Sequence, residues 1–207
     1  MKHQINTATW KRKEHFEFFS SMDDPFFGMT VSVDCTRTYA EAKEKGDSFF
    51  LASLYKIMRT VNTVEPFRYR IEDGKVFCYD TIHVSSTVGR DDETFGFSFF
   101  EYFPEYERFM QSCREEVDRI KSQPGLCFTE RKVERDLIFF TTLPWLNFTE
   151  LKHAGSRRKD DSIPRISTGK MIIEGDRRLL PVSVHVHHGL MDGLHVARFF
   201  EQLESVL

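Results

Sequence analysis

The amino-acid sequence predicts an α+β fold in which helices cover a mixed β-sheet in a two-layer sandwich. Apolar residues recur at helical spacing in segments on both sides of a stretch with strand-like alternation. The chain shows no internal repeat and no low-complexity tract, and its 207 residues are enough for one sizeable core. We therefore expect a single domain that spans residues 1–207.

The first part of the chain predicts two helices and a hairpin. Residues 10–19 are expected to form a short helix. Over residues 48–64 apolar positions recur every three or four residues, and Pro66 prevents further extension of this second helix. Asp73-Gly74 then lies between two short alternating segments, which is a strong hairpin signal.

The second part of the chain predicts further strands and two helices. In chain order these are strands at residues 81–88 and 95–102, a helix at residues 106–122, strands at residues 137–143, 166–173 and 179–188, and a helix from residue 194. Residues 152–161 are polar and charged, so we expect a surface loop there.

Composition excludes several classes of partner. The net charge is -3 and the basic clusters at residues 131–132 and 157–159 have acidic neighbours, so nucleic acid is not expected as a partner. No apolar run has the length of a signal peptide or a membrane span, so we expect a cytoplasmic protein without a membrane partner. The four cysteines are far apart and form no CxxC pair, which favours free thiols. The 21 phenylalanines indicate an interface or an apolar pocket.

The most informative segment is VSVHVHHGLMDG, residues 182–193. Alternate side chains of a strand point to opposite faces, so His188 continues the valine row, whereas His185 and His187 join the more polar side. A partly desolvated histidine stays neutral and can accept a proton, as a general base must. Asp192 could pair with an arginine and hold the histidine loop rigid.

Other roles compete for these histidines. A histidine at the end of a strand is more often a hydrogen-bonded structural residue than a catalyst. His185 and His187 also have the one-face spacing of a metal pair on a strand. A third ligand is missing nearby in the sequence, so we expect no metal.

Several segments resemble the chloramphenicol acetyltransferase family. The sequence HHGLMDG at residues 187–193 resembles the HHxxxDG motif of CoA-dependent acyltransferases, which also occurs in peptide-synthetase condensation domains and dihydrolipoamide acyltransferases. The sequences WKRKEHFE at residues 10–17 and LPWLNF at residues 143–148 resemble the family's WxR(K/R)EHFE and LPWxxF segments. The resemblance runs nearly from end to end, and condensation domains contain two such units and are longer.

This resemblance implies a single acyltransferase domain that moves acetyl from acetyl-CoA to an acceptor hydroxyl. In the family the second motif histidine, here His188, deprotonates the hydroxyl, which attacks the thioester directly in a ternary complex. Asp192 would form a structural ion pair with Arg12. Thr141 stands at the position of the family's serine, whose hydroxyl donates a hydrogen bond to the oxyanion. Losing such a donor costs about 3 kcal/mol of transition-state stabilisation. Acetyl-CoA is a co-substrate, and no bound cofactor is expected.

The resemblance also implies binding residues and an assembly. Ser167 falls where the family has a threonine that orders a water, and the alternative is a strand serine that faces solvent. Phe95 and Phe128 align with phenylalanines of the acceptor pocket, and the alternative is plain core. The family is a homotrimer with active sites between subunits, which would use the excess aromatic surface.

The chain departs from the family mainly in the loop after Trp145. An apolar, asparagine-rich segment is replaced here by a charged loop at residues 152–161, although a chloramphenicol pocket must be mostly apolar. The acyl donor is thus better defined than the acceptor, for which chloramphenicol is the leading candidate. Two other hypotheses are a catalytically silent trimeric binding protein and a metal-dependent enzyme that uses His185 and His187.

Overall fold

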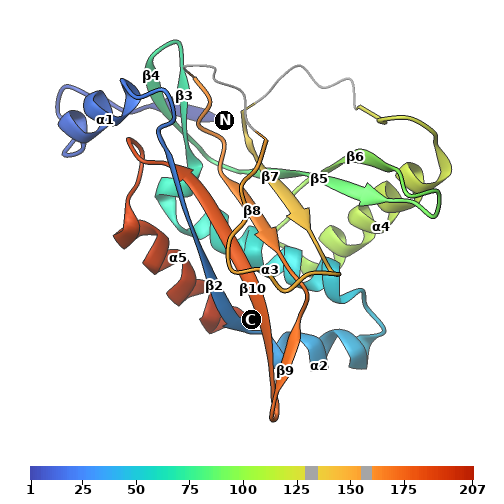
Figure 1. Ribbon diagram of the computed structural model, residues 1–207. Helices are drawn as coiled ribbons and strands as arrows, with labels where there is room; N and C mark the ends of the chain where they lie inside the picture. The colour runs from blue at the N-terminus through green and yellow to red at the C-terminus, as the bar shows by residue number, and fades with distance from the viewer. Residues whose placement is uncertain (129–134, 155–159) are drawn as a thin grey trace.

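The computed structural model describes residues 1–128, 135–154 and 160–207. Its main element is a seven-stranded mixed sheet with the order β2-β10-β8-β7-β5-β6, and β9 also pairs with β10 (Figure 1). The strands are β2 (Phe26–Asp34), β5 (His83–Gly89), β6 (Phe95–Phe100), β7 (Leu137–Thr142), β8 (Arg165–Thr168), β9 (Ile172–Glu174) and β10 (Arg177–His187). β7 is parallel to both of its neighbours, and the other pairs are antiparallel.

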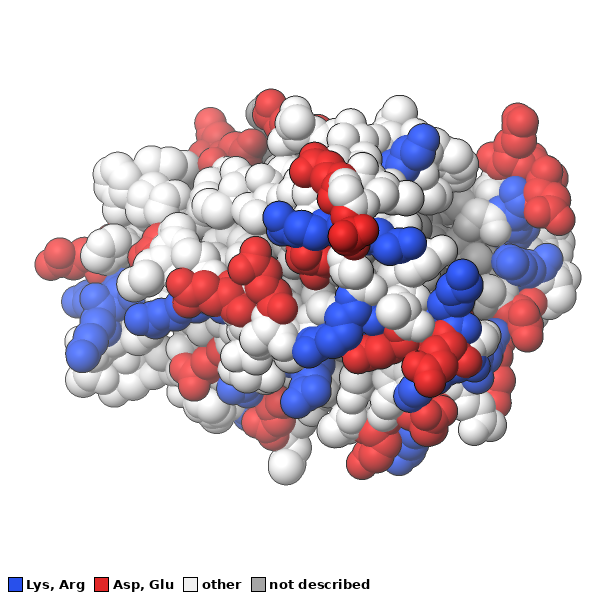
Figure 2. Space-filling model, turned by 90° about the horizontal axis from the view of Figure 1, so that it is seen from below, with Lys and Arg blue, Asp and Glu red and all other residues white. Residues whose placement is uncertain are grey.

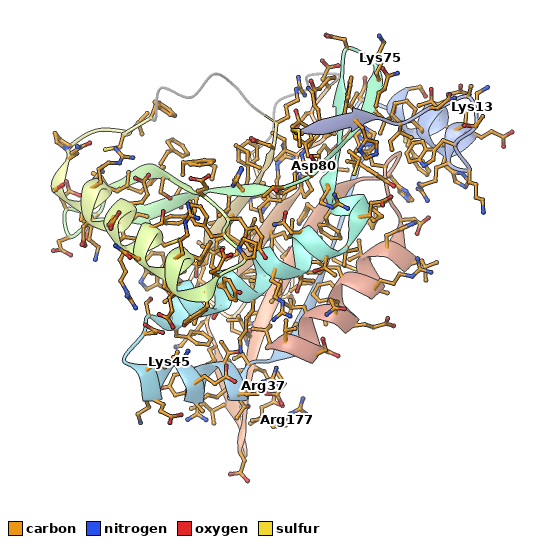
Figure 3. The ribbon with its side chains drawn as sticks, turned by 180° about the vertical axis from the view of Figure 1, so that it is seen from behind. Lys13, Arg37, Lys45, Lys75, Asp80 and Arg177 are labelled. Atoms are coloured by element: carbon orange, nitrogen blue, oxygen red, sulfur yellow. The ribbon has the colours of Figure 1, made fainter. Side chains whose placement is uncertain are left out.

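Helices cover one face of this sheet, as Figure 3 shows from behind. They are α2 (Thr36–Lys45), α3 (Phe49–Thr63), α4 (Tyr106–Ser122) and α5 (Gly193–Val206). The main core cluster joins their apolar faces to one row of sheet side chains, which includes Val182, Val184 and Val186 of β10. We call this the helix-covered face and the opposite one the open face. The expected two-layer α+β sandwich is confirmed.

A smaller sheet lies beside the first helix. It has the order β1-β4-β3 and consists of β1 (Lys2–Gln4), β4 (Lys75–Tyr79) and β3 (Tyr69–Glu72), the last preceded by the 3-10 turn η1 (Glu65–Arg68). The helix is α1 (Lys13–Ser20). Asp73 and Gly74 join β3 to β4 with φ of 48° and 72°, the left-handed pair that a tight hairpin turn requires. The hairpin prediction is therefore confirmed.

Several predicted boundaries are wrong. The strand expected at residues 166–173 is two strands, because the Gly169 and Lys170 amides donate to the Pro181 and Leu146 carbonyls outside the ladder. β10 ends at His187, so His188 lies in the following turn. The prediction did not include β2 or α2. α2 is mostly polar, with Thr38 and Ala42 as its buried residues, and gives little apolar periodicity.

Charges of both signs are interspersed on the face seen in Figure 2. The clusters at residues 131–132 and 157–159 lie outside the described residues. Across the described ranges, no helix has the length and hydropathy that crossing a bilayer requires.

Candidate active site

His188 is held in a fixed place directly after β10. Its ring stacks on Phe19 with centroids 3.8 Å apart and planes 3° apart, and it packs on Phe27 at 4.5 Å. Its backbone amide donates to the Pro25 carbonyl at 2.8 Å. Phe27 pairs with Val186 across the sheet and packs against the main core, so the ring lies toward the helix-covered face. This is the side that strand alternation predicts.

An ion pair lies beneath the turn that carries His188. Arg12 Nη1 is 2.5 Å from Asp192 Oδ2, and Arg12 Nη2 donates to the His188 carbonyl at 3.1 Å. Burial alone would raise the pKa of Asp192, but the bonds to Arg12 and His195 lower it to about 2. The carboxylate is therefore ionised at neutral pH, and Arg12 connects it directly to the backbone of His188.

The position of Arg12 is fixed by the packing of its segment against the small sheet. Phe16 of α1 belongs to a second core cluster with Leu190 of the histidine turn, and Trp10 packs against it. The Trp10 ring meets Tyr69 of β3 edge-on at 5.7 Å. The segment around Arg12 and the segment after His188 are thus buried against the same strands, although 176 residues separate Arg12 from His188 in the sequence.

His187 differs from its neighbour. It is 1% exposed, and its Nδ1 accepts a hydrogen bond from the Gly189 amide at 3.1 Å. Burial and the adjacent His188 lower the pKa of His187 to about 4, so the ring is neutral at physiological pH. Ser183 and His187 are both buried, so this polar side of the strand end is shielded from solvent.

Thr141 and Ser167 are neighbours on the open face. Thr141 pairs with Ser167 across β7 and β8, and Ser167 pairs with Ser183 of β10. Ser167 is completely buried, which excludes a strand serine facing solvent. The two hydroxyl side chains that the resemblance singles out therefore lie side by side.

The same register separates Thr141 from His188. Ser183 of β10 is level with Thr141 of β7, two strands or about 10 Å away across the sheet. His188 lies five residues beyond Ser183, which adds about 16 Å along the direction of β10. The Thr141 and His188 side chains also lie toward opposite faces. A base and an oxyanion donor must each lie about 3 Å from the reacting atoms. One chain alone does not bring them to the same substrate.

The two predicted pocket phenylalanines are exposed. Phe95 is 47% and Phe128 is 69% exposed, so the alternative that they are plain core is wrong. Phe97 joins them, with ring centroids 5.6 Å from Phe95 and 5.0 Å from Phe128. Trp145 of the LPWLNF segment is 75% exposed. Together they leave a large aromatic surface uncovered in a single chain.

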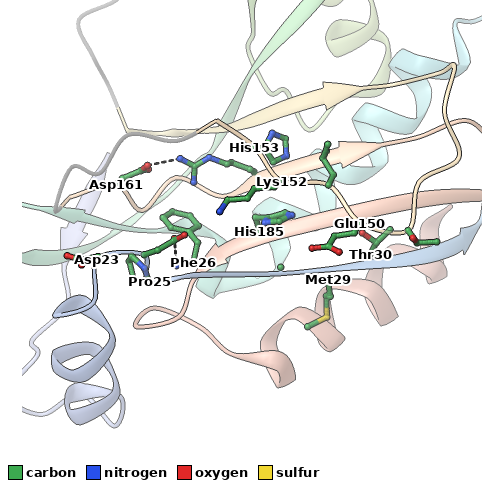
Figure 4. Close-up of a pocket in the computed structure, with 15 residues that line it drawn as sticks. Asp23, Pro25, Phe26, Met29, Thr30, Glu150, Lys152, His153, Asp161 and His185 are labelled. Carbon is green, nitrogen blue, oxygen red and sulfur yellow. Dashed lines mark hydrogen bonds and ion pairs between the residues drawn. The ribbon is translucent and has the colours of Figure 1, made fainter.

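A cavity of about 620 Å³ opens on the open face (Figure 4). Lys152 and His153 both line it, together with His185 of β10 and Arg165 of β8. His153 Nε2 is 3.0 Å from Ser167 Oγ, and its ring meets that of His185 at 5.5 Å and 86°. The described start of the charged loop thus turns inward over the sheet.

A second cavity of about 480 Å³ lies near the end of β7. Its lining includes Thr142, next to Thr141, and the cations Arg114 and Lys121 of α4. Ser48, the N-cap of α3, also borders it. Among the residues that the structure describes, no group of three or more histidine, cysteine, aspartate or glutamate side chains could hold a metal ion.

Comparisons with known proteins agree with this geometry. Chloramphenicol acetyltransferase 3 of Escherichia coli is 30% identical over 204 residues, which cover 98% of this chain and 95% of that protein. Chloramphenicol acetyltransferase 2 of Escherichia coli is 31% identical over 97% of this chain and 94% of its own length. A solved structure of a chloramphenicol acetyltransferase matches with a TM-score of 0.93 at 33% identity, over the full length of both chains.

A more distant solved structure shares the fold alone. The probable dihydrolipoamide acetyltransferase from Listeria monocytogenes matches with a TM-score of 0.66 at 14% identity, over 99% of this chain and 92% of its own. The fold and the curated relatives define the chain as an acyltransferase. A family model for chloramphenicol acetyltransferase matches residues 2–204, and the chain belongs to this family. The resemblance noted in the sequence is confirmed.

Proposed function

We propose that the protein transfers acetyl from acetyl-CoA to an acceptor hydroxyl, with His188 as the general base. The observation that carries this proposal is the fixed position of His188 at the end of β10. Its ring is clamped by Phe19, and its carbonyl is bound by Arg12, which pairs with Asp192. Chloramphenicol is the leading acceptor, because the relatives with 30% and 31% identity are chloramphenicol acetyltransferases.

In the proposed reaction the neutral ring of His188 removes the proton of the acceptor hydroxyl as its oxygen attacks the thioester carbonyl. The carbonyl becomes a tetrahedral oxyanion, which accepts a hydrogen bond from the Thr141 hydroxyl. The carbon–sulfur bond then breaks, and the proton held by His188 passes to the leaving thiolate. The products are the acetyl ester and free CoA, and His188 is neutral again.

The cavity beside Thr142 supports a site for acetyl-CoA. CoA carries several phosphate charges, and the lining holds two cations, Arg114 and Lys121, against one anion, Asp118, although Arg114 is also paired with Asp47. Thr141, the proposed oxyanion donor, precedes Thr142 in β7. Thr141 and Thr142 face opposite sides of the sheet, so a thioester that enters from this cavity would have to pass the end of β7 to reach the Thr141 hydroxyl.

We also propose a homotrimer in which His188 of one chain meets Thr141 of its neighbour. The separation of these two residues within one chain supports this arrangement, as does the exposed aromatic surface at Phe95, Phe128 and Trp145. Burial of that surface against a second copy would remove it from water. We place the protein in the cytoplasm, which its four free cysteines support.

The test is release of free thiol from acetyl-CoA in the presence of chloramphenicol and of other alcohols. We expect His188→Ala to lower kcat by about 100-fold or more, because general base catalysis contributes about that much. The matched control is His3→Ala, an exposed histidine of the small sheet, which should keep wild-type kcat. Full activity of His188→Ala would contradict the mechanism.

Two further outcomes separate the competing hypotheses. CoA binding without thiol release on any alcohol would favour a silent binding protein. Loss of activity in chelator would favour a metal-dependent enzyme. Turnover on another alcohol but not on chloramphenicol would keep the reaction and change the acceptor.

A further inference from the structure

We propose that His153 is a positioning residue of the acceptor site, which holds the Ser167 hydroxyl beside Thr141. The inference rests on the proposed function, because it concerns the same site. His153 belongs to the loop in which this chain departs from its family. The structure brings Lys152 and His153, at the described start of that loop, over the open face of the sheet.

The contact between the two side chains is direct and partly buried. Ser167 is completely buried and pairs with Thr141 on the adjacent parallel strand. Its Oγ lies 3.0 Å from His153 Nε2. A serine hydroxyl otherwise rotates freely, so one bond to a ring nitrogen fixes where its remaining hydrogen-bonding capacity points. Here that bond determines what the hydroxyl offers to an acceptor next to Thr141.

His153 is itself held by His185 of β10. The two rings meet edge to face at 5.5 Å, and the His185 side chain is bonded to the Leu151 backbone. The His185 ring lies across Gly28 of β2, where a Cβ atom would come within 2.5 Å of the ring. Glycine at position 28 therefore leaves the space that the His185 ring occupies. Figure 4 shows the side chains of His185 and His153 at the same cavity.

Burial is the main cause that keeps His153 neutral. Burial, and then the neighbouring His185 and Arg165, lower the pKa of His153 to about 4. Arg165 is paired with Asp161 at 2.6 Å and stacks on Phe26 at 4.5 Å. A neutral imidazole has one donor and one acceptor nitrogen. His153 and His185 are thus polar, uncharged groups in a lining that also holds the charged Lys152 and Arg165, and they suit an acceptor that places a hydroxyl or amide against them.

A double-mutant cycle tests whether His153 acts through Ser167. We expect His153→Ala and Ser167→Ala each to lower kcat/KM for chloramphenicol by about tenfold, as losing one buried hydrogen bond commonly does. The double variant should lose no more than either single variant. His153→Gln, which keeps a hydrogen-bonding group, should recover most of the loss. KM for acetyl-CoA should stay unchanged, the urea midpoint should fall only by the loss of one hydrogen bond, and His3→Ala is the control.

The outcomes distinguish this inference from the proposed function. Losses that multiply to about 100-fold in the double variant, or full activity of His153→Ala, would overturn the positioning role. If His188→Ala is inactive in the same assay while both His153→Ala and Ser167→Ala are fully active, the reaction stands and this inference fails. A parallel rise in KM for acetyl-CoA would indicate a general structural role and would also overturn it.

Discussion

The adjacent residues His187 and His188 have very different surroundings, although only the end of β10 separates them. His187 closes β10 as a buried, neutral side chain, whereas the ring of His188 lies between Phe19 and Phe27 at the edge of the core. Strand alternation assigns them to opposite faces, and that part of the reasoning needs only the sequence. The partners are not predictable in this way, because Phe19 and Phe27 lie far from His188 in the chain and carry no sequence signal for the contact.

The low pKa of His187 predicts an acid-labile fold. The unfolded chain binds a proton at His187 near pH 6.5, whereas the folded chain does so only near pH 4. The free energy of unfolding should therefore fall as the pH decreases from 6.5 toward 4, by up to about 3 kcal/mol from this residue. His153 shifts in the same direction.

Urea unfolding at several pH values and one protein concentration measures this dependence. His187→Gln removes the titrating ring, so its free energy of unfolding should decline less steeply than that of the wild type between pH 6.5 and 4. Equal slopes for the two proteins would show that His187 does not carry the effect.

At the scale of elements, the sequence predicts the helices and strands whose apolar residues recur regularly, and it does not predict those with irregular patterns. α4 begins and ends at the predicted residues because its apolar positions recur regularly, and the hairpin turn at Asp73-Gly74 has its own signal. β2 and α2 give weak patterns, and the end of β10 depends on the backbone bond from His188 to Pro25. Tertiary contacts set those boundaries.

Asp192 has two roles, which two substitutions separate. It is the N-cap of α5, where its Oδ1 accepts from the Leu194 amide at 3.1 Å, and it pairs with Arg12. Asparagine caps helices as well as aspartate does, so Asp192→Asn should lose only the ion pair. Asp192→Ala should in addition lose about 1 kcal/mol of the free energy of unfolding.

Activity should respond to the ion pair rather than to the cap. Arg12 bonds both Asp192 and the His188 carbonyl, so we expect both substitutions to lower kcat by on the order of tenfold to 100-fold through a displaced base. Thiol-release kinetics and urea unfolding on the same preparations measure the two effects. Wild-type kcat in Asp192→Asn would show that the pair does not position His188.

At the scale of the whole molecule, the sequence predicts the α+β sandwich and the family, and the structure and comparisons confirm both. What no pattern along the chain reveals is that His188 and Thr141 lie far apart, on opposite faces of one sheet. That separation follows only from the strand order and register. It makes an active site shared between chains the central claim about this molecule.

Co-assembly of two inactive variants tests that claim most directly. His188→Ala and Thr141→Ala are each expected to be nearly inactive as pure proteins. When they are co-expressed in equal amounts, a site with His188 from one chain and Thr141 from the next should form in about a quarter of cases. We expect about a quarter of wild-type thiol release from the mixture, whereas activity no higher than the mean of the two pure variants would contradict an active site shared between chains.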